Sequence, residues 1–280
     1  MKRLILAALI CIIPAYAYAN DIRVSVGEVK DSRGTGYFSE LEIKLKVMGD
    51  TVSDAKGIKV KVTRAVDDTG RELLKDEERS ADFTKPDEYG TGQAEVTVKL
   101  KNPARKASVV KEISGKVSIF SPKKDPNAVA TVKDFMSGSG KPLQHPALKA
   151  AKVEVSVLTK KQYEEIKEKE KKQAKEKAGE MAGELGAALV KAFGSLFSGM
   201  MEIGENSVIL SIADPESKVV DMEFMENGKR VKNTSSMRMG DVRVYEFENP
   251  MPQDAQMVIY LLTPQSLIKE PFKLTDIALP

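Results

Sequence analysis

The fold is decided by a stretch in which apolar and charged side chains alternate strictly, Leu41-Glu42-Ile43-Lys44-Leu45-Lys46-Val47. Successive side chains of an extended strand point to opposite faces, so this repeat of two makes one face apolar and the other charged. Such a strand buries one face in a core and leaves the other in water. The same alternation returns at 59–62, at 95–100 and at 152–157, and we therefore predict a mostly β chain.

Residues 20–158 are expected to form one antiparallel β-sandwich domain. Their strand-like segments are short and are separated by turn-forming groups such as Asp67-Asp68-Thr69-Gly70 and Ser137-Gly138-Ser139-Gly140. The strand spacing resembles that of immunoglobulin-type sandwiches, although the Cys…Trp…Cys pattern of that family is absent from a sequence without Trp. The resemblance implies an Ig-like architecture and no particular function.

Residues 205–280 are expected to form a small C-terminal β domain. An apolar stripe at Val208, Leu210 and Ile212 predicts one strand, and Asn227-Gly228 predicts a tight hairpin. A segment this short buries little core of its own. A second arrangement therefore stays open, in which this region completes the first sandwich and the helix between them is an insertion.

Residues 159–204 are expected to form a long helix that joins the two β regions. Thr159 is a suitable N-cap, and no Pro interrupts the segment. From Lys160 to Lys177 the chain holds eight Lys and five Glu, which favours a solvated helix that stands partly clear of the globular body.

The second half of this segment, 178–201, is rich in Gly and Ala and is expected to be an amphipathic helix. Between Leu185 and Met201 only Lys191 is charged, and a helix that is apolar almost all round is buried in protein or in membrane. Its candidate contact residues for a membrane or a partner are Leu185, Leu189, Phe193, Leu196, Phe197 and Met200.

Three interpretations of this Gly-rich half stay open. It packs against the sandwiches or pairs with a second copy in the manner of a coiled coil, since small residues spaced by four permit close helix contact. It lies in a membrane interface, with its two Phe on the apolar side. It docks onto another envelope protein.

The first 19 residues have the pattern of a secretory signal peptide. Met1-Lys2-Arg3 is a cationic start, an uncharged run follows from Leu4 to Ile13, and Ala17-Tyr18-Ala19 offers a cleavage site. The single cysteine, Cys11, lies inside this segment. We expect a cysteine-free mature chain, periplasmic or secreted after removal of residues 1–19, in a bacterium.

The sequence offers no recognisable catalytic centre, so we expect no enzyme, no catalytic residues, no metal site and no cofactor. His145 is the only histidine, and with no mature Cys the usual zinc sites lack ligands. Asp67-Asp68-Thr69-Gly70 lacks the spaced oxygen ligands and final Glu of an EF-hand loop. The formal charge of +3 includes Lys2 and Arg3, so we expect no nucleic-acid partner.

The sequence therefore predicts an exported, non-enzymatic interaction or structural protein of the bacterial envelope. Two β-sandwich regions frame a long helix, and the helix or the sheet faces bind a protein partner, either an envelope protein or a second copy. The alternative is a membrane-associating or oligomerising protein that acts through the Gly-rich helix 178–201.

Overall fold

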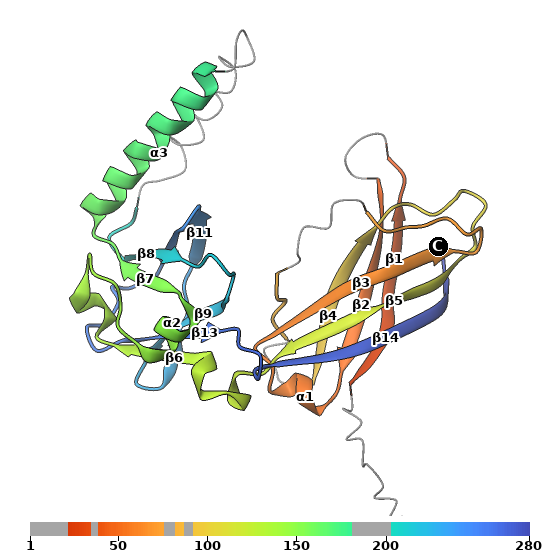
Figure 1. Ribbon diagram of the computed structural model, residues 1–280, viewed down its shortest axis with the longest axis horizontal. Helices are drawn as coiled ribbons and strands as arrows, with labels where there is room; N and C mark the ends of the chain where they lie inside the picture. Colours follow the sequence, from red (N-terminus) through yellow and green to blue (C-terminus); the bar gives the residue numbers. More distant parts are fainter. Residues whose placement is uncertain (1–21, 35–38, 76–81, 87–91, 181–202) are drawn as a thin grey trace, which may run out of the picture.

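The computed structural model describes residues 22–34, 39–75, 82–86, 92–180 and 203–280. The prediction of a mostly β chain is confirmed, because 50% of the structure is strand, arranged in four antiparallel sheets. Figure 1 shows two bodies side by side, each made of two sheets. We call them the first and the second sandwich.

The first sandwich consists of two three-stranded sheets that enclose one apolar core. One sheet has the order β1-β2-β4 and the other β14-β5-β3. Their strands are β1 (Arg23–Ser32), β2 (Glu40–Met48), β3 (Gly57–Asp67), β4 (Gln93–Leu100), β5 (Val109–Phe120) and β14 (Leu267–Ala278). Leu41, Ile43 and Leu45 of β2 are fully buried in this core, as their alternation with charged residues predicts. The short helix α1 (Asp50–Ser53) precedes β3.

The second sandwich consists of two four-stranded sheets, ordered β10-β9-β13-β6 and β11-β12-β8-β7. Their strands are β6 (Val129–Lys133), β7 (Glu154–Val157), β8 (Ser207–Ala213), β9 (Val219–Glu226), β10 (Lys229–Val231), β11 (Ser235–Met239), β12 (Val242–Glu246) and β13 (Gln256–Leu261). The β9–β10 hairpin turns at Asn227 and Gly228, whose φ angles are 49° and 76°. The hairpin predicted from this dipeptide is confirmed.

The helical elements are few and mostly short. The 3-10 helices η1 (Pro122–Lys124) and η2 (Pro126–Ala128) connect β5 to β6, and η3 (Phe135–Gly138) and α2 (Pro146–Ala151) lie between β6 and β7. Helix α3 (Lys160–Glu180) follows β7. Among the described residues, α3 is the one α-helix longer than six residues.

The expected fold class, two sandwich regions joined by a long helical segment, is wrong. The strands on either side of the helix, β7 and β8, are antiparallel neighbours in one sheet, with Ser156 opposite Ser211. The strand before helix α3 and the next described strand after it therefore belong to the same sandwich, so α3 does not link the two bodies. Alternation along a strand predicts which face is buried, but it carries no information about which strand lies alongside.

Strands from each of the two expected β regions also pair with strands of the other sandwich. Strands β6 and β7, from the region 20–158, pair with strands of the second sandwich. Strand β14, from the region 205–280, pairs with β5 along its whole length in the first sandwich, and Phe272 and Ile277 enter its core. The chain thus passes between the sandwiches twice, after β5 and again after β13.

Candidate functional site

Helix α3 begins with a reciprocal cap that fixes its direction. The Gln162 backbone N–H donates to Thr159 Oγ1 at 3.3 Å, and the Thr159 backbone N–H donates to Gln162 Oε1 at 2.9 Å. This is a capping box, in which two backbone donors at the helix start are satisfied by each other's side chains. The predicted N-cap at Thr159 is confirmed.

One aromatic side chain attaches α3 to the second sandwich. Tyr163 is 0% exposed and packs on Ile209, Val242 and Val244 of the sheet β11-β12-β8-β7. These three residues lie on the face of the sheet that points away from the main core. The start of α3 therefore covers part of the outer face of this sheet, and Ile166 adds a partly buried contact.

Beyond this anchor the helix leaves the protein surface. Glu168, Lys169, Lys172, Gln173 and Glu176 are exposed, and Figure 1 shows α3 projecting past the sheets of the second sandwich. The candidate contact residues expected from the sequence lie outside the described residues. They are Leu185, Leu189, Phe193, Leu196, Phe197 and Met200.

A second group of interest is a charged cluster at the junction of the two sandwiches. Glu223 of β9 is 8% exposed and accepts hydrogen bonds from Lys56 Nζ at 3.1 Å and from Tyr260 Oη at 2.7 Å. Arg230 Nη1 lies 3.8 Å from the same carboxylate. Lys56 belongs to the first sandwich and the other three to the second, so the cluster joins the two bodies.

The electrostatics of this cluster suit a permanent ion pair. Burial alone would raise the pKa of Glu223, but the hydrogen bonds from Tyr260 and Lys56 outweigh it and lower that pKa below its ordinary value. Burial and the neighbouring carboxylate also raise the pKa of Tyr260. Glu223 therefore remains ionised at neutral pH, whereas a general acid needs a raised pKa.

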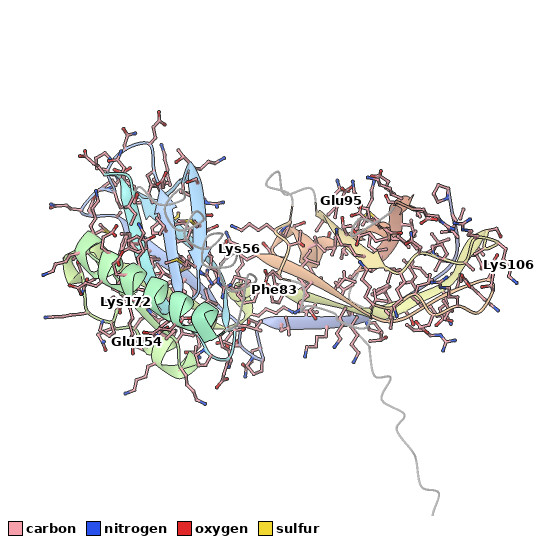
Figure 2. The ribbon with its side chains drawn as sticks, turned by 90° about the horizontal axis from the view of Figure 1, so that it is seen from above. Lys56, Phe83, Glu95, Lys106, Glu154 and Lys172 are labelled. Carbon is pink, nitrogen blue, oxygen red and sulfur yellow. The ribbon has the colours of Figure 1, made fainter. Side chains whose placement is uncertain are left out.

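The cleft beside the cluster has a volume of about 470 Å³ and is lined by Asp54, Asp221 and Glu223. Each of these carboxylates has a lysine partner, since Lys123 pairs with Asp54 and Lys85 pairs with Asp221. Figure 2 places the labelled Lys56 and Phe83 between the two sandwiches. Phe83 stacks edge-on against Phe120, with 6.2 Å between ring centroids. The junction is thus held by paired charges over a small aromatic contact.

The two motifs that the sequence raised for metal or catalytic chemistry have structural uses. His145 caps α2, because its Nδ1 accepts from the Ala147 N–H at 3.2 Å. Asp67 is buried and accepts from the N–H groups of Thr69, Arg71 and Ala104 at 2.9 Å each. The Asp67 carboxylate therefore organises the turn after β3.

Two kinds of feature are absent from the described residues. No group of three or more His, Cys, Asp or Glu side chains in this part of the chain is arranged to hold a metal ion. Within the same residues, none of the helices combines the length and apolar character that crossing a bilayer requires.

Comparison of the chain with protein-family models, with curated proteins and with solved structures finds no match to any of them. The function is therefore inferred from the residues and their geometry alone.

Sequence reasoning missed the docking surface of α3, although a signal for it exists. The run Val208-Ile209-Leu210 is apolar at three consecutive positions, and such a run is typical of a strand buried on both faces. In the structure Val208 and Leu210 enter the main core, whereas Ile209 meets Tyr163. The junction cluster had no comparable signal, because its members come from separate parts of the sequence.

Proposed function

We propose that the protein is an exported, non-enzymatic interaction protein of the bacterial envelope that contacts a protein partner through helix α3. The observation that carries the proposal is the one-ended attachment of α3. Its first turn is capped and anchored by Tyr163, and its described side chains beyond Lys167 are exposed. From Lys167 to Glu180 the helix extends roughly 20 Å, at about 1.5 Å per residue.

A helix attached in this way gains little stability from its own burial. Most helical stability in proteins comes from packing an apolar face, and among the described side chains of α3 the hydrophobic ones that pack, Tyr163 and Ile166, lie near its start. Its exposed length is therefore better explained by reach toward a partner, which is either another envelope protein or a second copy of the chain. The low-charge sequence between Leu185 and Met201 follows directly after it.

Site-specific photo-crosslinking tests this proposal. A photo-crosslinking residue replaces Lys172 or Gln173 on α3, and the control carries it at Lys106, which is also exposed and lies at the other end of the molecule (Figure 2). We expect one defined adduct, with another envelope protein or with a second copy, from the two α3 positions and none from position 106. Equal labelling from all three positions, or none from any, would overturn the proposal.

Export is part of the same proposal and has its own test. The signal-peptide pattern of residues 1–19 leads us to expect a mature chain that begins at Asn20. Mass spectrometry of the protein recovered from the envelope fraction should give this N-terminus. Recovery of the chain only from the cytoplasm, with residues 1–19 still attached, would contradict it.

The second candidate function is membrane association through the Gly-rich segment 178–201, and the sequence between Leu185 and Met201 favours it because only Lys191 is charged there. The test is a flotation assay in which a protein of residues 20–280 is mixed with uncharged lipid vesicles. The comparison is a variant with Leu189→Ser, Phe193→Ser and Phe197→Ser. Flotation that the variant abolishes would support this candidate, and no flotation of either chain would exclude it.

A further inference from the structure

The outer face of the sheet β14-β5-β3 carries a concentration of positive charge that the overall composition conceals. The strand register aligns outward positions in rows across the three strands. The inward neighbours of these positions, such as Val60, Val117 and Phe272, are buried in the core of the first sandwich. We call the outward surface the basic face. Its cations are Lys59, Lys61, Arg64, Lys116, Lys269 and Lys273.

The acidic residue in these rows is Glu112, which forms ion pairs with two of the six cations, and Lys59 has an interaction of its own. Lys273 Nζ lies 3.0 Å from Glu112 Oε2, and Arg64 Nε lies 3.5 Å from Glu112 Oε1. Among the described residues, no acidic side chain forms an ion pair with Lys61, Lys116 or Lys269. A net positive charge therefore remains on this face.

The register brings these like charges close together. Lys61 of β3 lies directly opposite Lys116 of β5, and Pro271 continues the row on β14. Neighbouring strands are roughly 5 Å apart and alternate residues roughly 7 Å, which is within the Debye length of about 8 Å at physiological salt. Like charges directly opposite each other destabilise a sheet, so a bound anionic surface would relieve a repulsion that the fold builds in.

The opposite face of the same sandwich is different. On the sheet β1-β2-β4, Lys44 lies 3.1 Å from Glu28 and 3.6 Å from Glu95, and Lys99 bridges Glu40 and Glu42. In Figure 2, Glu95 and strand β14 lie on opposite sides of the sandwich. Lys44, Lys46 and Lys99 of this face thus each lie within 4 Å of a carboxylate, which is not the case for Lys61, Lys116 and Lys269 among the described residues.

We propose that the basic face binds the surface of an anionic phospholipid bilayer. Headgroups of an anionic leaflet attract clustered Lys and Arg through charge alone, with no need for a pocket. The remaining positions in the three cationic rows are Ser114, Ser118 and Pro271, so these rows offer no aromatic ring on which a nucleobase could stack. Lysine is also depleted in protein–protein interfaces, where aromatic residues are enriched. A charged lipid surface is the partner that fits five Lys and one Arg on one sheet.

The test is co-sedimentation of a protein of residues 20–280 with lipid vesicles. One set of vesicles contains phosphatidylcholine alone, and the other contains phosphatidylcholine mixed with phosphatidylglycerol. The variant Lys61→Glu/Lys116→Glu/Lys269→Glu reverses the three cations that have no ion-pair partner among the described residues. The matched control, Lys133→Glu/Lys141→Glu/Lys229→Glu, makes the same change in net charge at exposed positions of the second sandwich. Thermal unfolding verifies that both are folded, and a Lys→Gln version of the first variant replaces it if the Glu version is not.

We expect binding to the anionic vesicles alone, weakened by added salt and retained by the control. Each lysine near an anionic surface contributes a factor of about five, so removing three positive charges should weaken binding about a hundredfold. Because the three new Glu side chains also repel the surface, the basic-face variant should lose at least that much. Three results would overturn the proposal. They are equal binding to neutral vesicles, equal losses in both variants, and binding to a single-stranded DNA oligonucleotide without binding to vesicles. The first would instead support the Gly-rich segment as the membrane element.

Discussion

Asp67 illustrates how one buried charge can hold a loop together. Its side chain is 0% exposed, and its two oxygens accept from Thr69, Arg71 and Ala104. Burial alone would raise the pKa of Asp67, but the hydrogen bonds from Ala104, Thr69 and Arg71 outweigh it and lower that pKa. The carboxylate thus ties the end of β3 to the segment that leads into β5.

The Asp67→Asn variant should lose roughly 2 kcal/mol or more of unfolding free energy, because an amide places a donor where the loop supplies only donors. Urea denaturation measures this loss. The control is Asp68→Asn, since Asp68 is exposed and its carboxylate accepts from Ser108 at the surface. Its loss should be clearly smaller, and equal losses in the two variants would contradict the assignment of Asp67.

Glu40 predicts a pH dependence of stability. Hydrogen bonds from Lys75 and Lys99 lower the pKa of Glu40 from 4.5 to about 2. A folded-state pKa below the unfolded value stabilises the fold at higher pH, and this contribution is lost as pH falls from about 4.5 toward 2. Urea unfolding of Glu40→Gln across this range should therefore show a shallower loss than the native chain. If unfolding free energy falls equally with pH in the native chain and in Glu40→Gln, Glu40 is not the source of the pH dependence.

At the scale of single elements, most strands could be predicted from the sequence. Alternation at 41–47 and the Asn227-Gly228 turn each specify local structure directly, and both are confirmed. Strand β11 was missed because Ser235-Ser236-Met237-Arg238-Met239 lies at a sheet edge and lacks a clear apolar stripe. The N-cap of helix α3 was predicted from the sequence. Its docking onto the second sandwich was not, because it depends on contact between Tyr163 and Ile209, which is distant in the sequence.

Tyr163→Ala should release α3 from the second sandwich. Removing a fully buried aromatic ring costs several kcal/mol, so amide protection against hydrogen exchange at 160–167 should fall by about a hundredfold. The control, Gln173→Ala, alters an exposed side chain of the same helix and should leave this protection unchanged. If protection at 160–167 survives the loss of Tyr163, another contact anchors the helix.

At the scale of the whole molecule, strand partners could not be predicted. Residues 205–280 were expected either to form a small β domain or to complete the first sandwich, and in the structure their last strand, β14, pairs with β5 of the first sandwich. Prediction of the candidate site from the sequence was limited for the same reason. The basic face exists only because the register of three strands, distant in sequence, aligns their lysines, and net charge conceals this alignment.

A chain that ends before Leu267 should lose the first sandwich and keep the second. Without β14, strand β5 lacks one neighbour and the core lacks Phe272 and Ile277. Hydrogen exchange should therefore show loss of protection in β2 and β5, with protection retained in β13. A synthetic peptide of residues 265–280 should restore it by adding the missing strand. Loss of protection confined to the second sandwich would contradict the assignment of β14 to the first sandwich.

The return of β14 has a consequence for how the protein is made. Strands β1 to β5 leave the ribosome long before residues 267–278 are translated, so the first sandwich has to wait for its last strand while the second can already close. Pairings between such distant segments form slowly. If the chain is threaded through a membrane from its N-terminus, as residues 1–19 suggest, this delay is useful. The segment that enters first, β1 to β5, stays unfolded and hence able to pass a narrow channel until β14 follows it.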